Sequence, residues 1–357
     1  MVTLAEIFRR HWPAYHARFG NAIPPAHRAA VAALLSCRTP DRGGQLFRCD
    51  CGALHYAYHS CGHRACHQCG HGDAKGWAQR QELKLLPVPY FLVTFTVPEE
   101  LRTVMRAHPQ ELYAALFRES RGALADVALT KLGIELGFTG VLHTWTRQLL
   151  FHPHVHYLVP GGGLTTDGLR WKRVADAQFF LPTKVLAARC KNRLRQWLQA
   201  EHPDLLKTIP ARAWRQAWVV DVQPVGRGQS ALRYLAAYVQ KTALSAARLV
   251  ACDEQSVTFT HQDRATGETK TLRLSGEEFL RRFLQHVLPT GFQRVRHYGW
   301  RSPAARKRWH RLHALLDWRP AESPHAPATA GWAPACPRCH KPMRLLGPLA
   351  RGPPWLR

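Results

Sequence analysis

Histidines at alternating positions are the first feature of this chain that points to chemistry. His152, His154 and His156 occupy every second residue of the segment 151–160, and the glycines at 161–163 follow directly. Successive side chains of a strand point to opposite faces, so the three imidazoles are expected on one side and the apolar residues between them on the other. Imidazole nitrogen is a common metal ligand. The pattern therefore predicts a metal or catalytic site rather than a row of solvated histidines.

Two tyrosines with helical spacing form a second pattern further along the chain. The segment 230–241 contains neither proline nor glycine and is rich in alanine and leucine, which predicts a helix. Within it, Tyr234, Tyr238 and Lys241 are four and three residues apart and share one stripe of the helix surface. Judged by spacing alone, packing of both tyrosines into a core is the simpler interpretation.

Together the two patterns suggest chemistry on a phosphodiester. A tyrosine hydroxyl is a poor nucleophile at neutral pH, but a metal ion that polarises the phosphate makes its attack effective. The resulting phosphotyrosine stores the bond energy for rejoining, and two tyrosines allow two successive attacks. Two histidines leave most coordination positions of Mg²⁺ or Mn²⁺ to phosphate oxygens and water. Lys241 is expected to offset phosphate charge or to protonate the leaving 3′ oxygen. The candidates for a third metal ligand are His152, Gln240 and Asp221.

Six of the ten cysteines fall between residues 37 and 69. Since we expect no export signal, this spacing predicts metal binding rather than disulfide bonds. Two close pairs of soft ligands suit tetrahedral Zn²⁺. The preferred ligands are Cys49, Cys51, Cys66 and Cys69, with Cys37, Cys61 and His63 as replacements or as parts of a second site.

A second short cysteine pair, Cys336 and Cys339, lies near the C-terminus. Two interpretations remain open for it. The pair binds zinc, together with His340 or with ligands from the N-terminal module, or it binds nothing.

The elements that must position these residues follow from hydrophobic patterning. Strands are predicted at 90–97, 138–150, 151–159 and 218–222, where apolar, β-branched and aromatic residues dominate. Two helices are predicted, one from 99 to about 117 and one over 122–133, and a basic amphipathic helix at 183–200. A β-hairpin is expected over 257–274, followed by a helix over 275–288 that Ser275 caps.

The segment 292–300 mixes basic and aromatic residues, as a surface that binds single-stranded DNA does. Its candidate DNA-binding residues are Arg294, Arg296, His297 and Tyr298.

The charge of the whole chain favours a polyanionic partner. The 357 residues include 50 Lys and Arg against 24 Asp and Glu, which gives a net charge of +26. Nucleic acid is the leading partner, and a ribosome-like structural role or binding to a membrane surface are the alternatives. No apolar run reaches transmembrane length, so we expect no membrane partner and a location in the bacterial cytoplasm, on the nucleoid.

Five separated motifs resemble the IS91 family of rolling-circle transposases. His154-Val155-His156 is similar to the HUH signature of single-strand endonucleases, and Tyr234-x-x-x-Tyr238 to the paired-tyrosine version of that signature. The cysteine module, the run 158–163 and the segment 283–299 complete the resemblance, which covers roughly residues 30–300. One departure is Cys49-Asp50-Cys51, which is one residue shorter than the family's CxxC.

The resemblance implies an α+β fold in which a ferredoxin-like or RRM-like antiparallel sheet, flanked by helices, holds the histidines centrally. The implied domains are an N-terminal zinc-binding module over 1–86, a catalytic domain over 87–318 and a C-terminal linker and tail over 319–357. The implied activity is nicking and rejoining of single-stranded DNA at element ends and target, through metal-dependent 5′-phosphotyrosine intermediates. It makes Tyr234 and Tyr238 the expected nucleophiles and His154 and His156 the metal pair.

Two other functions remain open on the sequence. One is a non-catalytic zinc-finger protein that binds nucleic acid, in which the histidines and tyrosines only pack. The other is a plasmid-type replication initiator or relaxase with the same nicking chemistry. The sequence pattern indicates no oligomeric state.

Overall fold

The computed structural model describes residues 2–69, 71–240, 243–263, 265–320 and 333–352; the side chains at 71–75, 237, 238 and 240 are outside that description. The chain forms two compact units, and each combines separated stretches of sequence. One unit contains Met1–Asp73, Gln240–Val287 and Glu322–Arg357, and the other contains Ala74–Val239 and Leu288–Ala321. The expected domains were three consecutive segments of the chain, over 1–86, 87–318 and 319–357. The two units are arranged differently, because the chain leaves the second unit at Val239 and returns to it at Leu288.

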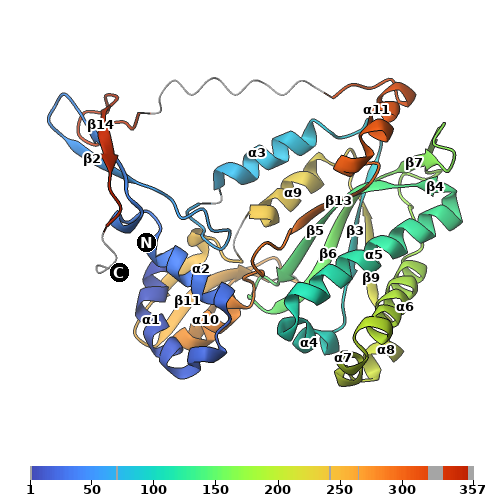
Figure 1. Cartoon of the computed structure of the whole chain (residues 1–357), viewed down its shortest axis with the longest axis horizontal. Coiled ribbons are helices and arrows are strands. Elements are labelled where there is room, and N and C mark those ends of the chain that lie inside the picture. The colour runs from blue at the N-terminus through green and yellow to red at the C-terminus, as the bar shows by residue number, and fades with distance from the viewer. Residues whose placement is uncertain (1, 70, 241–242, 264, 321–332, 353–357) are drawn as a thin grey trace. The chain divides into compact units, whose positions relative to one another are not determined.

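The second unit is built on a five-stranded antiparallel sheet, seen at the right of Figure 1. The strand order across the sheet is β13-β5-β6-β3-β9. The strands are β3 (Tyr90–Thr96), β5 (Gly137–Trp145), β6 (Phe151–Pro160), β9 (Val219–Pro224) and β13 (Val295–Gly299). The strands predicted at 90–97, 151–159 and 218–222 are confirmed, as is the mixture of helices with an antiparallel sheet. The strand predicted at 138–150 is also present, but it ends at Trp145, five residues earlier than predicted.

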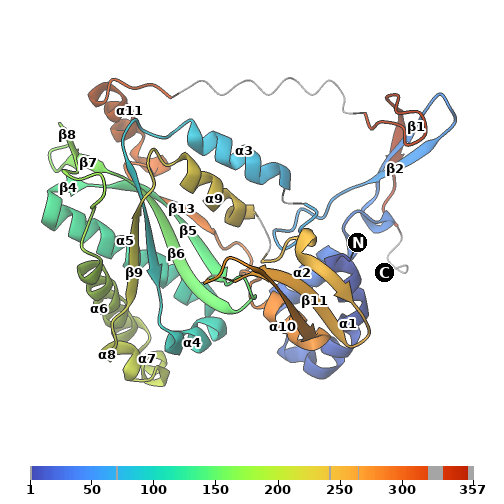
Figure 2. The same ribbon diagram turned by 180° about the vertical axis from the view of Figure 1, so that it is seen from behind.

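One face of this sheet carries the main hydrophobic core. Val155, Tyr157 and Val159 of β6 point into it, and they pack with residues of α5 (Pro109–Leu132) and α6 (Thr183–Glu201). The turned view in Figure 2 shows the same helices from the other side of the sheet. The shorter helices of this unit that follow β3 and α6 are α4 (Arg102–Ala107), α7 (Pro203–Thr208) and α8 (Arg212–Arg215).

The break expected between two helices, from about 117 to 122, is wrong, because α5 continues through Gly122. A glycine inside a helix usually weakens it. Here a Cβ atom at Gly122 would lie 2.6 Å from the guanidinium of Arg193 on α6. Arg193 forms ion pairs with Glu119 and Asp126 of α5. Gly122 therefore serves the contact between the two helices and does not end a helix.

The opposite face of the sheet packs against a second set of helices. Val141 and Leu158 contact a smaller core that includes Leu232 and Leu235 of α9 (Gln229–Gln240) and Leu312 of α11 (Arg306–Leu315). Trp77 of α3 (His71–Glu82) packs against the same core. A small sheet, ordered β4-β7-β8, contains β4 (Ile134–Glu135), β7 (Gly162–Thr165) and β8 (Trp171–Arg173).

The first unit contains two three-stranded sheets. The sheet β10-β11-β12 comprises β10 (Leu249–Cys252), β11 (Ser256–Gln262) and β12 (Thr269–Ser275). The helix α10 (Gly276–Leu284) packs on β11 and β12, and α1 (Leu4–Phe19) packs against both α10 and α2 (Pro25–Ser36). The hairpin predicted over 257–274 is confirmed, and the Ser275 hydroxyl caps α10 by accepting from the Glu278 amide at 3.2 Å. The helix ends at Leu284, four residues earlier than predicted.

The other sheet of this unit, β14-β1-β2, was not predicted. It joins β1 (Gly44–Arg48) and β2 (Leu54–Tyr58), inside the cysteine module, to β14 (Arg344–Leu349) near the C-terminus. Short 3₁₀ turns complete the described elements, at Gly20–Ala22, Pro40–Arg42, Glu99–Leu101, Ala246–Arg248 and Pro303–Ala305. Among the described helices, none combines the length and the apolar character that crossing a membrane requires.

Candidate functional site

Three imidazoles meet on the α9-facing side of the five-stranded sheet. Antiparallel pairing places His143 of β5 directly opposite His154 of β6, and places Thr94 of β3 opposite His156. The candidate ligand nitrogens of His143, His154 and His156 all lie within 4.8 Å of one another. The three side chains are buried, with exposed fractions of 5%, 8% and 6%. This three-imidazole group is the only cluster of histidine ligands found among the described residues.

Hydrogen bonds orient two of these rings. Nδ1–H of His154 donates to the backbone oxygen of His152 at 2.6 Å, which leaves the lone pair on His154 Nε2. That Nε2 lies 2.9 Å from Nδ1 of His143. Nδ1 of His156 lies 2.8 Å from the Thr94 hydroxyl. A hydrogen bond of this kind fixes the tautomer and the direction of a ligating histidine.

The far nitrogen of His156 is available for a ligand. Its Nε2 is buried and meets no hydrogen-bond partner within the described part of the chain. Burial disfavours the charged imidazolium and lowers the pKa of His156 to about 4. His156 is therefore neutral near pH 7, the form in which imidazole binds metal.

His152 is not a member of the three-imidazole group. The β5–β6 register shifts by one residue after the His143–His154 pair, so that Trp145 pairs with Phe151. His152 and Pro153 thus both oppose one residue of β5, as in a β-bulge. Proline has no amide hydrogen for the ladder and is tolerated at such a point. Nδ1 of His152 accepts a hydrogen bond from Arg102 at 2.9 Å.

His143 is the member of the group that the sequence pattern did not single out. It was assigned only to the interior of the strand predicted at 138–150. The signal was present in the hairpin, because a short connection between Trp145 and Phe151 sets which residues face each other. Counting back across that hairpin places His143 opposite His154, whereas a search along one strand finds only His152, His154 and His156.

Of the predicted nucleophiles, the structure describes the side chain of Tyr234. Its ring lies edge to face with that of His156, with centroids 5.8 Å apart, and 42% of the residue is exposed. Tyr238 belongs to the same helix α9, but its side chain lies outside the described residues. Lys241 and the side chain of Gln240 also lie outside them.

Asp221, the acidic candidate for a third metal ligand, lies on β9. Its Cα partner across the ladder is Thr94, which in turn pairs with His156. Two strand spacings, about 10 Å, therefore separate Asp221 from His156 along the sheet. The Asp221 carboxylate accepts a hydrogen bond from Gln223 at 2.7 Å. It is not part of the three-imidazole group.

The residues predicted to bind DNA lie at the β13 edge of the sheet. Arg294 is only 9% exposed, and its guanidinium lies over the Trp145 ring at 5.4 Å. Arg296 lies over Phe117 at 4.5 Å, and Tyr298 packs against the main core. His297 Nδ1 lies 2.9 Å from the Thr139 hydroxyl. Much of this segment is thus engaged in packing, and its role in binding DNA stays a prediction.

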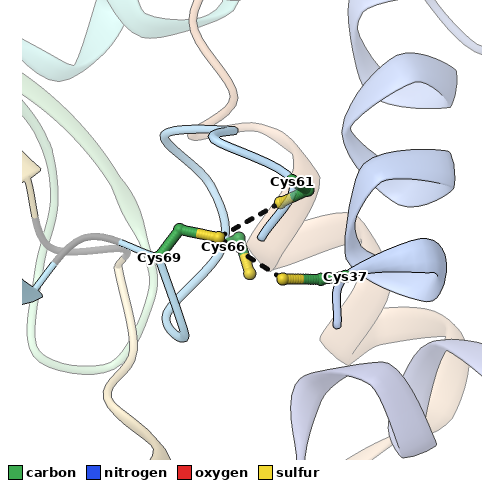
Figure 3. Close-up of side chains that lie close together, drawn as sticks. All are labelled: Cys37, Cys61, Cys66 and Cys69. Atoms are coloured by element: carbon green, nitrogen blue, oxygen red, sulfur yellow. Dashed lines mark hydrogen bonds between the residues drawn. The ribbon is translucent and has the colours of Figure 1, made fainter. Parts of the chain in front are cut away.

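The predicted zinc ligands fall into two clusters instead of one. Cys37, Cys61, Cys66 and Cys69 form the first, which we call the N-terminal cysteine cluster; Figure 3 shows their sulfur atoms gathered together. Cys37 follows the end of α2, and the other three come from the loop after β2. The Cys69 sulfur lies 3.3 Å from that of Cys37 and 3.4 Å from that of Cys61.

The thiols of this cluster differ in how easily they ionise: burial raises the pKa of Cys37 to about 11, and the hydrogen bond with Cys61, followed by burial, raises the pKa of Cys66. Hydrogen bonding, with Cys66 the largest contributor, lowers the pKa of the Cys61 thiol to about 5. His63, a proposed alternative ligand, contributes its backbone amide to the Cys61 sulfur at 3.4 Å. Its Nδ1 accepts from the Ala65 amide at 3.1 Å, so that nitrogen is already engaged.

The second cluster, which we call the split cysteine cluster, unites Cys49 and Cys51 with Cys336 and Cys339. The expected set of Cys49, Cys51, Cys66 and Cys69 is therefore divided between two clusters. Close pairs in sequence were assumed to share one metal, but β14 pairs with β1 and brings a pair from the far end of the chain.

Comparison with known proteins identifies two family models that match this chain. Residues 137–308 match a family model described as "Putative transposase", and residues 7–97 match one described as "Transposase zinc-binding domain". The chain is 35% identical over 322 residues to the protein named putative transposase y4qJ of Sinorhizobium fredii, covering 83% of this chain and 79% of that one.

A second relative is the transposase for insertion sequence element IS801 of Pseudomonas savastanoi pv. phaseolicola. The two are 28% identical over 289 residues, which cover 75% of this chain and 68% of the relative. No solved structure matches the chain significantly. The two family models and these relatives, together with the cysteine clusters, show that the chain belongs to the IS91 family of transposases and has an N-terminal zinc-binding domain.

Proposed function

We propose that this transposase nicks and rejoins single-stranded DNA at the ends of its element and at the target, through 5′-phosphotyrosine intermediates, in rolling-circle transposition. The observation that carries the proposal is the position of Tyr234 beside the three-imidazole group, with 5.8 Å between the centroids of its ring and that of His156. A phenol beside a candidate metal site is the arrangement that tyrosine attack on a phosphodiester requires.

His143, His154 and His156 would hold the divalent ion. Their ligand nitrogens are close together, and the buried Nε2 of His156 has no hydrogen-bond partner among the described residues. When bound, the ion would polarise the phosphodiester and stabilise charge on the departing oxygen. Nitrogen ligands suit Mn²⁺ better than Mg²⁺, which prefers oxygen, so Mn²⁺ is the better candidate of the two.

In the proposed step, the Tyr234 hydroxyl attacks a backbone phosphorus and loses its proton. A bond forms between the phenolic oxygen and phosphorus, and the bond from phosphorus to the 3′ oxygen breaks. The 5′ phosphate stays on the tyrosine, and the 3′ oxygen takes up a proton. Attack by a 3′ hydroxyl on the phosphotyrosine rejoins a strand and frees the tyrosine. Tyr238 is proposed as the second nucleophile, and Lys241 as a proton donor or charge partner.

The strand order supports an HUH-type catalytic fold. The order along the chain is β3, α5, β5, β6, α6, β9, and the order across the sheet is β5-β6-β3-β9, with β13 added beside β5. A β-α-β-β-α-β unit of antiparallel strands in this order is ferredoxin-like. In such a sheet β6 is a central strand, which suits a rigid platform for the histidines.

We assign the structural Zn²⁺ of the zinc-binding domain to the N-terminal cysteine cluster. All four of its sulfur atoms lie within 4.8 Å of one another, and the matching family model spans residues 7–97, which include them. Four thiolates are a common ligand set for structural zinc.

DNA is the partner that a transposase requires, and the net charge of +26 favours it. The single-stranded form is part of the proposal, because tyrosine attack here is expected on an unpaired strand. We place the reaction in the bacterial cytoplasm, on the nucleoid, where the element and its targets lie.

The test is covalent trapping of the protein on its own DNA. The full chain is incubated with end-labelled single strands from the element ends and Mn²⁺, and then run on a denaturing gel. Wild type is expected to carry label into the protein band. Replacing both Tyr234 and Tyr238 by Phe should abolish the labelled band, while Tyr15→Phe, on α1, serves as the matched control and should retain it.

Two outcomes would contradict the proposal. Label that persists in the Tyr234→Phe, Tyr238→Phe double variant would show that another residue is the nucleophile. Absence of any adduct from folded wild type, with binding of the same strands intact, would favour a non-catalytic zinc-finger protein that only binds nucleic acid.

A further inference from the structure

We infer that the split cysteine cluster is a second structural zinc site, in which Cys49 and Cys51 from the N-terminal region and Cys336 and Cys339 from the C-terminal tail bind one Zn²⁺. This inference goes beyond the nicking function and does not depend on it. It also goes beyond the zinc-binding family model, because that match covers residues 7–97 and so includes Cys49 and Cys51 but not Cys336 and Cys339.

The sulfur positions match a tetrahedral site. The Cys49 sulfur lies 3.4 Å from that of Cys339, and the Cys51 sulfur lies 3.6 Å from that of Cys336. A zinc ion with Zn–S bonds of about 2.3 Å requires sulfur atoms about 3.8 Å apart. A disulfide requires about 2.05 Å, and all four cysteines are unbridged. The spacing is therefore that of thiolates around a metal.

Each half of the cluster ends in a backbone turn that places a residue in the left-handed region, and the C-terminal turn is one residue longer than the N-terminal one. After Cys51, Gly52 adopts a φ of 84° and donates its amide to the Cys49 oxygen at 2.9 Å. After Cys339, His340 adopts a φ of 58° and donates to the Cys336 oxygen at 2.9 Å. A non-glycine residue in this left-handed region is uncommon, and it is held where the surrounding structure requires it.

Further backbone contacts prepare each turn for a thiolate pair. The amide of Cys49 donates to the Ala53 oxygen, and that of Cys336 donates to the Lys341 oxygen, both at 2.9 Å. The Arg338 amide points at the Cys336 sulfur at 3.4 Å. An amide that donates to sulfur stabilises the charged thiolate, the form that binds metal.

The hydrophobic contacts around the cluster are few. The buried residues there are Phe47, Cys49, Ala53, Cys336 and Met343. The ion pair between Arg344 and Asp50 measures 3.0 Å, but both side chains are about four-fifths exposed, and surface pairs of this kind add little. Small modules with such a core usually depend on a metal or on disulfides. Zinc would therefore supply much of the stability that holds β14 on β1.

The first experiment measures zinc content in the full chain. It compares wild type with the variant Cys51→Ser, Cys339→Ser, which changes the two least buried ligands and leaves Cys49 and Cys336 in the core. Zinc is determined by mass spectrometry after gel filtration in chelator-treated buffer. The variant should contain one zinc fewer per chain than wild type, whereas Cys252→Ser, outside both clusters, should retain the wild-type amount.

A second readout separates a metal ligand from a packing residue. Cys339→His should retain the second zinc, since imidazole replaces thiolate in many zinc sites. Cys339→Ser should lose that zinc. In Cys339→Ser, hydrogen exchange of the β14 amides at 344–347 and 349 should accelerate at least about tenfold relative to wild type.

Equal zinc content in wild type and in the Cys51→Ser, Cys339→Ser variant would overturn the inference. So would loss of zinc with no change in the exchange of β14. Neither result would bear on adduct formation at the tyrosines, so failure of this site and failure of the nicking proposal are distinguishable.

Discussion

At the scale of single residues, the site depends on which imidazoles share one metal position. His143 and His154 face each other across two strands, and Thr94 holds His156 from the third. His152 lies in the bulge itself and interacts with Arg102. Pairing across neighbouring strands therefore identifies the histidines of the site better than spacing along one strand does.

Replacing His143 should weaken the metal site more than replacing His152. In His143→Ala, one of three ligands is removed, and we expect Mn²⁺ affinity to fall by about 10–100-fold or more, since even outer-shell changes have effects of that size. His152→Ala is the matched control and should change the affinity by less than about tenfold. Isothermal titration with Mn²⁺ measures both, and a larger effect at His152 would contradict this assignment.

His297 should make folding stability depend on pH. Burial, followed by the charges of Arg301 and Lys84, lowers its pKa to about 4 in the folded chain, from 6.5. The unfolded chain therefore binds more protons between pH 6.5 and 4, so stability is complete above that window and is lost as the pH falls through it. The upper limit is about 1.4 kcal/mol per pH unit, reduced because the ring is partly exposed.

The measurement is urea unfolding of wild type and His297→Asn at several pH values from 7 to 4. The stability of wild type should fall more steeply than that of the variant as the pH decreases. Comparing the two removes contributions that they share, such as release of zinc by acid. Parallel curves for the two proteins would contradict the assigned pKa.

At the scale of elements, the regular strands and helices were predictable and the irregular points were not. β6 follows from alternation of polar and apolar residues, and α9 follows from its composition. The bulge at His152 and Pro153 depends on a partner strand, and the continuity of α5 through Gly122 depends on Arg193 of another helix. The sheet β14-β1-β2 is the largest omission, because its third strand lies almost 300 residues from the others and carries no strong local pattern.

Gly140 of β5 should be intolerant of a side chain. It pairs with Tyr157 across the ladder, and a Cβ atom at Gly140 would lie 2.5 Å from the ring of that fully buried tyrosine. Gly140→Ala should therefore destabilise the sheet by about 1–3 kcal/mol through overpacking. Gly347→Ala is the control, since a Cβ there meets nothing within 4 Å. Thermal unfolding compares the two, and equal melting temperatures would contradict the packing argument.

At the scale of the whole molecule, both units are assembled from distant parts of one chain. One unit carries the three-imidazole group and Tyr234, and the other carries both cysteine clusters. Linear domain boundaries could not reveal this arrangement, because the second unit is interrupted by residues 240–287 and the first is completed only by the tail. The positive charge, by contrast, could be predicted from the amino-acid composition alone.

Binding of single-stranded DNA should depend steeply on salt. With a net charge of +26, the chain is expected to release counterions from several phosphates. Affinity for a labelled oligonucleotide should fall by about 100-fold or more between about 50 and 200 mM salt. Fluorescence anisotropy measures it, and an affinity that does not change with salt would contradict the electrostatic account.

The most direct test of the central claim identifies the amino acid that carries the DNA. The Mn²⁺-dependent adduct is digested with protease and nuclease, and the peptide that retains a nucleotide is sequenced by mass spectrometry. The position of Tyr234 beside the three-imidazole group predicts a 5′-linked nucleotide on Tyr234 or on its helical neighbour Tyr238. A nucleotide on any residue outside α9 would contradict the account.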